Sequence, residues 1–141
     1  MTLYNEDLIL KVKKIPSVNA MYLNRGSGGK RLSPEAQEFK ADLSLKLSNS
    51  SLKKNLLINE NRGYILHIVY VLQKKSFLRR DLDNLNKATI DSIFDYLGVN
   101  DSRLIELHTY KKGSNTNEEF DFIKLRIEAG NPIKDYYVQD T

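Results

Sequence analysis

The hydrophobic and polar residues of this chain follow two kinds of pattern, one that predicts strands and one that predicts helices. Asp7 to Ile15 and Tyr64 to Gln73 are rich in apolar and β-branched residues, and the second is apolar enough for the centre of a sheet. In two other segments the apolar residues recur every three or four positions, which is the spacing of one helix face. The expected order is strand, helix, strand, helix, strand, strand, over 7–15, 33–49, 64–73, 83–97, 104–110 and 120–127.

Both expected helices carry signals at their ends. Ser33-Pro34-Glu35 opens the first helix, because serine caps free amides, proline fits the first helical position and glutamate favours the positive end of the helix dipole. Gly98 ends the second helix, as glycine commonly does. The apolar face of the first helix consists of Ala36, Phe39, Leu43 and Leu47, and that of the second of Leu85, Thr89, Ile93 and Leu97, widened by Ile90, Phe94 and Tyr96.

The remaining segments read as connections. Residues 17–32 are rich in glycine and basic residues and predict a flexible basic loop, and the polar residues 113–117 predict the turn of an antiparallel hairpin between the last two strands. His67 is expected to be a half-buried strand residue rather than a catalytic one. The sequence therefore predicts one small α+β domain over 1–141, with a mixed sheet, two main helices, a core at about 7–128 and a loose tail at 130–141.

Composition narrows the class of protein. A chain of 141 residues with 40% apolar residues has room for one core, and the absence of cysteine excludes disulfides, thiolate nucleophiles and cysteine-ligated zinc. The longest apolar stretch is about half of what a membrane-spanning helix needs, and the N-terminus lacks the basic-then-apolar order of a secretory signal. We therefore expect a cytoplasmic protein without a membrane segment.

The net charge of +4 is unevenly distributed. Residues 1–80 carry 15 lysines and arginines against 6 acidic residues, whereas residues 81–141 carry 7 against 12. A basic half favours a polyanionic partner such as nucleic acid, because cationic side chains replace the counterions of phosphates. A solvated surface without any such partner is the alternative interpretation.

The most informative segment joins the central strand to the second helix. Asp81 and Asp83 are two positions apart, so in extended backbone both side chains leave on the same side. Two carboxylates in this position can hold a hard cation such as Mg²⁺. Lys87 follows one helical turn later and can point back to the same region, while Arg79 and Arg80 bring positive charge beside it.

A structural interpretation of these residues competes with the metal site. Asp83 can cap the helix, and Asp83 with Lys87 can form an ordinary helical ion pair. Asp101 favours the metal site, because it lies close to Asp81 and Asp83 if the next strand lies beside the central one. Asp91 is two helical turns beyond Asp83, about 12 Å away, so we place it outside the metal ligands as a cap or structural partner.

These residues resemble the RusA family of Holliday-junction resolvases, small endonucleases common in phages and prophages. The resemblance is carried by Arg80-Asp81-Leu82-Asp83-Asn84-Leu85, Lys87-Ala88, Asp91, and Gly98-Val99-Asn100-Asp101 followed by Leu104-Ile105. The opening also fits, with Ile15-Pro16-Ser17-Val18-Asn19, Tyr22 and Ser33-Pro34-Glu35-Ala36. The match covers about residues 8–128 and implies a RusA-like fold.

The resemblance also implies roles for individual residues. Asp81, Asp83 and Asp101 would hold catalytic Mg²⁺, with Mn²⁺ as a possible substitute, and Lys87 would assist at the scissile phosphate. Asn100 stands where the family usually has the first aspartate of a pair, and with Asn84 and Asp91 it is expected to play a supporting or structural part. The family acts as a homodimer, which suits two symmetric cuts in a four-way junction, and no organic cofactor is expected. Backbone contacts to DNA are expected from Lys30, Arg31, Lys53, Lys54, Lys74, Lys75, Arg79 and Arg80.

Three functions therefore remain to be compared. The first is a Mg²⁺-dependent, structure-selective endonuclease that resolves Holliday junctions in recombination and repair in a bacterial host cell, or that acts mainly on forks or flaps. The second is a branched-DNA-binding module without catalysis, in which the carboxylates are caps and ion pairs. The third is RNA binding, which the lack of tryptophan and of a glycine-flanked aromatic strand motif disfavours.

Overall fold

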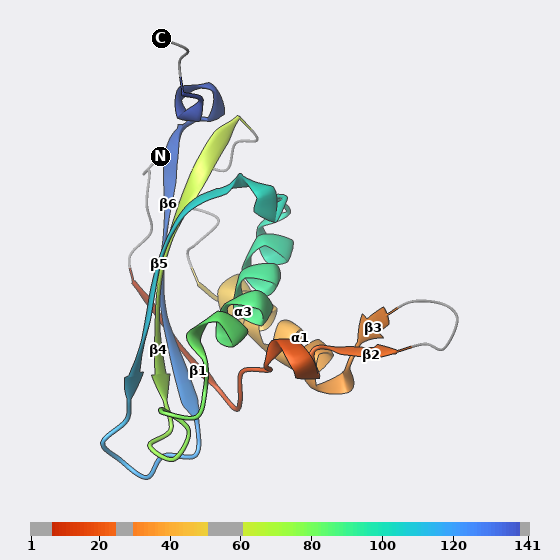
Figure 1. Ribbon diagram of the computed structural model, residues 1–141, viewed down its shortest axis with the longest axis vertical. Helices are drawn as coiled ribbons and strands as arrows, with labels where there is room; N and C mark the ends of the chain where they lie inside the picture. The colour runs from red at the N-terminus through yellow and green to blue at the C-terminus, as the bar shows by residue number, and fades with distance from the viewer. Residues whose placement is uncertain (1–6, 25–29, 51–60, 139–141) are drawn as a thin grey trace.

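A computed structural model of the chain describes residues 7–24, 30–50 and 61–138. These residues form a four-stranded sheet, a small two-stranded hairpin and two long helices (Figure 1). The strands of the sheet are β1 (Leu8–Val12), β4 (Arg62–Leu72), β5 (Leu104–Gly113) and β6 (Asp121–Pro132), and those of the hairpin are β2 (Tyr22–Asn24) and β3 (Lys30–Leu32). The helices are α1 (Pro34–Ser48) and α3 (Leu82–Leu97), with short 3-10 turns η1 (Val18–Ala20), η3 (Asp101–Arg103) and η4 (Ile133–Tyr136).

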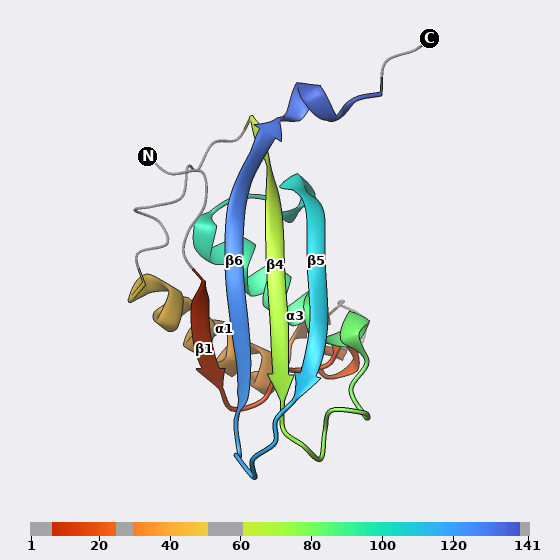
Figure 2. The ribbon, with the colours of Figure 1, turned by 90° about the vertical axis from the view of Figure 1, so that its left-hand side faces the viewer.

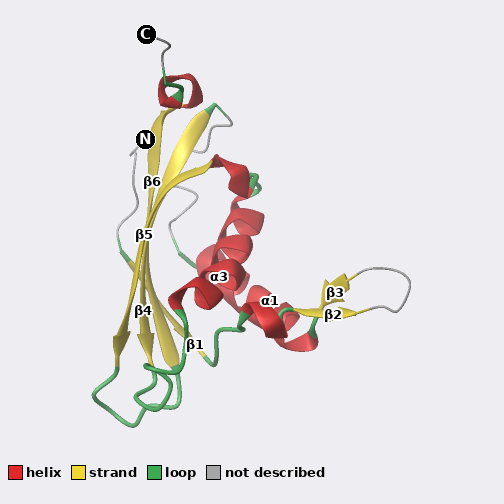
Figure 3. Ribbon diagram, viewed as in Figure 1, coloured by secondary structure: helices red, strands yellow, loops and turns green. Residues whose placement is uncertain are grey.

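The sheet is mixed, as predicted. Its strand order is β1-β6-β4-β5, and only the β4–β5 pair is parallel (Figure 2). Both long helices lie on the same side of the sheet (Figure 3). The described residues place no long helix on the other side, which we call the bare side of the sheet. The predicted α+β class, with one mixed sheet and two main helices, is therefore confirmed. No helix in the described ranges is long and apolar enough to cross a membrane.

Strand β4 is the centre of the core, as its apolar sequence predicts. Every second side chain of this strand, from Tyr64 to Leu72, faces the helices and is fully buried. The opposing layer comes from both helices, and the predicted faces of Ala36, Phe39, Leu43 and Leu47 in α1 and of Leu85, Thr89, Ile93 and Leu97 in α3 are all buried. The helical periodicity of the sequence therefore identified the core correctly.

The helix ends also agree with their sequence signals. The Ser33 hydroxyl accepts a hydrogen bond from the Ala36 amide at 3.1 Å, which satisfies one free N–H in the first turn of α1. Gly98 terminates α3 with φ of 72°, a left-handed conformation that glycine adopts without steric cost.

The predicted hairpin between the last two strands is wrong. Strands β5 and β6 do not pair with each other, because both pair with β4, one on each side. Their connection crosses the end of β4, where the Ser114 amide bonds to the Leu72 carbonyl at 2.8 Å and the Gln73 side chain to the Glu119 carbonyl at 3.0 Å. The most apolar strand thereby gains neighbours on both edges, which a hairpin beside it would not have provided.

Two further predictions about connections need correction. The expected loop at 17–32 contains the η1 turn and the β2–β3 hairpin, with residues 25–29 outside the described ranges. The expected loose tail contains the end of β6 and the η4 turn as far as Tyr136, whereas Tyr137 and Val138 are largely exposed. In it the Ile133 amide bonds to the Asn61 carbonyl at 2.7 Å and the Tyr136 hydroxyl accepts from the Asn131 amide at 2.9 Å, so this segment is attached to the end of the sheet.

Candidate functional site

Asp81 and Asp83 lie at the N-terminal end of α3, and both are exposed. Asp81 is the N-cap residue, but its side chain makes no capping hydrogen bond, and Asp83 lies in the first turn. Neither carboxylate forms a hydrogen bond or ion pair with another residue of the described ranges. The structural interpretation predicted a cap at Asp83 and an ion pair with Lys87, and neither is present.

Lys87 points the other way, towards the C-terminal half of the helix. Its ammonium group lies 3.1 Å from both carboxylate oxygens of Asp91, one turn further on. This hydrogen bond raises the pKa of Lys87, partial burial opposes it, and the nearby charge of Asp101 adds to the increase. Lys87 is therefore a cation at neutral pH, and the expectation that it points back to Asp83 is wrong. Asp91 is a structural partner, as expected.

Asp101 does not lie close to Asp81 and Asp83. Strand β5 does lie beside β4, but the two are parallel and Leu104 pairs with Tyr64 at the start of β4, whereas Asp81 follows the end of β4. The 16 residues of α3 separate these two ends, which is about 24 Å at 1.5 Å per residue. Within the described residues, no group of three or more acidic or histidine side chains is arranged to hold a metal.

Asp101 is instead close to Asp91. Both line a cavity of about 410 Å³ between the C-terminal half of α3, α1 and the β2–β3 hairpin, with Tyr22 and Asn100 also in its wall. The Asn100 side chain accepts from the Ser102 amide at 2.9 Å and thus caps η3, which is a structural role. Asn84 is half-buried at the start of α3. The acidic residues therefore lie in two regions, Asp81 and Asp83 at the start of α3 and Asp91 and Asp101 around the cavity beside its C-terminal half.

The predicted DNA-binding residues fall into two regions. Lys74, Lys75, Arg79 and Arg80 lie in a series of turns at 73–80, which follows the end of β4 and leads into α3. Lys30 and Arg31 belong to β3 of the hairpin, which extends from the body on the side of the helices (Figure 1). The positions of Lys53 and Lys54 lie outside the described residues.

Sequence reasoning missed two basic residues near the first region. Lys13 and Lys14, which follow β1, line a cavity of about 420 Å³ together with Lys75, Arg79 and Arg80. We call this cavity the basic cleft; Gln73, Ser76 and the buried Asp121 complete its lining. The sequence does show two adjacent lysines at the end of the first predicted strand. Because they are about 60 positions away from 75–80, nothing in the sequence indicates that the two segments lie close together.

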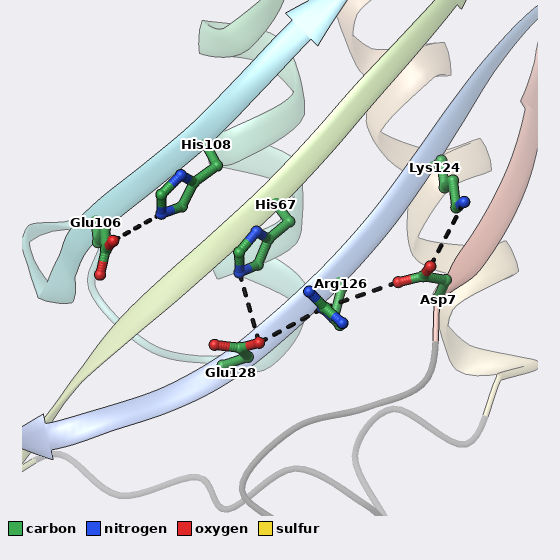
Figure 4. A network of polar contacts seen from close by, with 7 residues as sticks. All are labelled: Asp7, His67, Glu106, His108, Lys124, Arg126 and Glu128. Atoms are coloured by element: carbon green, nitrogen blue, oxygen red, sulfur yellow. Dashed lines mark hydrogen bonds and ion pairs between the residues drawn. The ribbon is translucent and has the colours of Figure 1, made fainter.

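A separate polar network covers the bare side of the sheet. His67 and His108 stack with ring centroids 4.7 Å apart, and each lies beside a glutamate, Glu128 at 3.5 Å and Glu106 at 2.6 Å (Figure 4). Arg126 links Glu128 to Asp7, which also pairs with Lys124. His67 is 30% exposed within this network, so the prediction of a half-buried strand residue is confirmed.

No protein-family model matches the chain and no curated protein matches it. The resemblance to RusA therefore depends on the quoted residues alone and stays a prediction.

Proposed function

We propose that the protein is a Mg²⁺-dependent, structure-selective DNA endonuclease that resolves four-way junctions. One observation carries the proposal: Asp81 and Asp83, two positions apart, are exposed carboxylates without a structural partner among the described residues, directly after the basic segment 73–80. Caps and ion pairs are the usual reasons for such aspartates at a helix start. Neither reason applies here, which favours the binding of something outside the chain by these carboxylates. The resemblance implies that they bind a metal ion.

The residues of one chain fit Mg²⁺ only in part. Asp81 and Asp83 provide the oxygen ligands that this cation prefers, but Asp101 is at the opposite end of α3. In a two-fold dimer with antiparallel α3 helices, the start of one helix would lie beside the end of the other, since a two-fold interface pairs residues reciprocally. We therefore infer that Asp81 and Asp83 of one chain complete the site with Asp101 of a second.

The proposed chemistry is hydrolysis of a phosphodiester. When bound between these carboxylates, Mg²⁺ would supply an activated water ligand and positive charge for the phosphoryl and leaving oxygens. Lys87, which is charged at neutral pH, adds positive charge next to Asp101 and can balance the charge that develops at the phosphorus. Lys74, Lys75, Arg79 and Arg80 position the DNA through its backbone, because phosphate contacts fix the register of a strand without reading sequence.

Cleavage of a synthetic four-way junction tests the proposal, with linear duplex, a fork and a flap in parallel, in Mg²⁺, Mn²⁺ and EDTA. We expect paired nicks in the junction that require the metal. Preferred cutting of the fork or flap would keep the nuclease and change its substrate. Binding of the junction without cutting in either metal would instead support the non-catalytic DNA-binding module.

The variant Asp83→Asn isolates the metal ligand. We expect it to lower the cleavage rate by at least about 100-fold, since loss of a ligand removes the metal's contribution, while junction binding in EDTA is retained. The matched control is Asp95→Asn, because Asp95 is an exposed carboxylate on the same helix that pairs with Lys40. Equal cleavage by Asp83→Asn and wild type would refute the assignment of Asp83.

A further inference from the structure

The basic cleft concentrates positive charge from two distant parts of the sequence. Lys13 and Lys14 form one wall, and Lys75, Arg79 and Arg80 come from the turns after β4. Lys13, Lys14, Lys75 and Arg79 are exposed, and none of them forms an ion pair within the described ranges. Among the described residues Asp121 is the only carboxylate in the lining; it is buried with 2% of its surface exposed, and its charge interacts with Arg80 and Lys14. One carboxylate leaves the five cations of the cleft with an excess of positive charge. Like charges held this close repel unless an anion lies between them.

The walls of this cleft are fixed by hydrogen bonds. The Arg80 guanidinium donates to the Ile15 carbonyl and so joins the turn segment to the residues after β1. Lys111 of β5 donates to the Phe77 and Arg80 carbonyls at 2.7 and 2.6 Å. Beneath them, Asp121 accepts from the Gln73 amide at 3.0 Å. These hydrogen bonds tie the turn segment 73–80 to β5, β6 and the residues after β1. The backbone around the cleft therefore loses little conformational entropy when a ligand binds, which favours affinity.

We propose that the basic cleft is a phosphate-binding site that holds the backbone of the DNA strand leading to Asp81 and Asp83. This inference rests on the proposed function for the identity of the ligand. The placement supports it, because Arg80 lines the cleft and the next residue, Asp81, begins α3. The cleft and the carboxylate pair are therefore neighbours along the chain, and a strand with one phosphate in the cleft would have its next phosphates near that pair. Lys13 and Lys14 become DNA contacts that the family resemblance does not identify.

The shared chemistry of the ligand is the phosphate group, and two sources can supply it. A nucleic-acid backbone presents phosphates in series and binds with a steep dependence on salt, whereas free phosphate binds as a single ion. The experiment therefore has one arm with a fluorescein-labelled four-way junction and a second with inorganic phosphate. The first arm follows fluorescence anisotropy in EDTA over a salt series, so that binding is measured without cleavage.

The test variant is the pair Lys13→Ala and Lys14→Ala, and the matched control is Lys124→Ala with Lys134→Ala. Both change the charge by the same amount, but Lys124 lies on the bare side of the sheet and Lys134 in η4 at its far end. We expect the test pair to weaken junction binding about tenfold or more near 0.1 M salt. The slope of log K against log salt should become shallower by about 0.9 for each phosphate that the variant no longer neutralises, while the control stays within about twofold of wild type.

The possible outcomes separate this inference from the proposed function. Cleavage with normal junction affinity in the test pair would overturn the cleft and leave the nuclease intact. Weakened binding in the test pair, with no cleavage by wild type in any metal, would support the cleft and refute the nuclease. Equal losses in test and control pairs would overturn the cleft, because general charge then explains binding.

A folding control and the phosphate arm complete the design. Lys13→Arg with Lys14→Arg should restore binding if charge at these positions is what matters, and failure of this rescue would count against the site. Inorganic phosphate should shift the amide resonances of 13–14 and 73–80 and compete with the junction only weakly. If phosphate competes strongly with the junction while the test pair leaves the junction affinity unchanged, the cleft binds a small ligand and the backbone assignment is overturned.

Discussion

Asp121 shows how burial of one side chain sets the pH response of this fold. The carboxylate is almost fully buried, and burial raises its pKa above the ordinary value, while the hydrogen bond from Gln73 and the charge of Arg80 oppose the increase. The folded protein therefore holds this proton more tightly than the unfolded chain does. By linkage, ionisation of Asp121 lowers the stability as the pH rises through the raised pKa, and below about pH 4 the penalty disappears.

The variant Asp121→Asn removes this titration and keeps an oxygen that can accept from Gln73. We expect its free energy of unfolding to increase relative to that of wild type as the pH rises from about 4 through the raised pKa of Asp121, and the difference then to level off. Urea unfolding curves at a series of pH values measure this difference. A difference that stays constant over the range would show that Asp121 has the same proton affinity in both states.

Sequence could propose single residues for the candidate site, but not the directions in which their side chains point. Asp81, Asp83 and Asp101 stand out because carboxylates at element ends are available to ligands. The direction of Lys87 was ambiguous, because helical spacing allows a pair with Asp83 or with Asp91 equally well. The structure pairs it with Asp91. The lysines of the basic cleft were missed because charge convergence across 60 residues depends on the tertiary fold.

At the scale of elements, Asn86 connects helix α3 to two strands. Its side-chain oxygen accepts from the Tyr70 hydroxyl of β4 at 2.8 Å and from the Thr109 hydroxyl of β5 at 3.2 Å. Tyr70 is fully buried, and burial raises its pKa far above the ordinary value, so the hydroxyl stays protonated and keeps donating. These two hydrogen bonds hold helix α3 in position over β4 and β5, which form the parallel strand pair of the described sheet.

The variant Asn86→Ala should lower the free energy of unfolding by about 1–3 kcal/mol, because it leaves a buried hydroxyl with fewer partners. Asn84→Ala is the matched control, since Asn84 is half-buried in the same helix and we expect a change within about 0.5 kcal/mol. Urea unfolding gives both values. A double-mutant cycle with Tyr70→Phe then isolates the pair, and additive effects would contradict the coupling.

Elements were more predictable than their pairing. Periodicity and end signals found both helices and all four long strands, because local sequence determines those features. The strand order β1-β6-β4-β5 could not be predicted from the sequence. A short connection between two strands predicts a hairpin, and the sequence does not show that a third strand will pair with both. Here β4 competes successfully, because its alternate side chains are fully buried and both of its edges are paired.

At the scale of the whole molecule, Asp81 and Asp83 lie at the start of α3, whereas Asp101 follows the other end of this helix, which is about 24 Å long. A proposed metal site that uses all three carboxylates therefore needs a second chain, which gives the expected homodimer a geometric reason. A site shared between chains makes a prediction that a site within one chain does not. Heterodimers of two inactive variants distinguish the two arrangements.

We expect a heterodimer of one Asp83→Asn chain and one Asp101→Asn chain to recover cleavage. In the shared arrangement one of its two sites carries both substitutions and the other carries none, so a single intact site nicks the junction once. In the unshared arrangement each site carries one substitution and stays inactive.

Chains with different affinity tags, refolded together and purified through both tags, provide this heterodimer. Each homodimeric variant and a doubly tagged wild type serve as controls. Inactivity of the mixed dimer beside an active wild-type preparation would contradict the shared site, as would a wild-type enzyme that cleaves junctions while light scattering shows it to be a monomer.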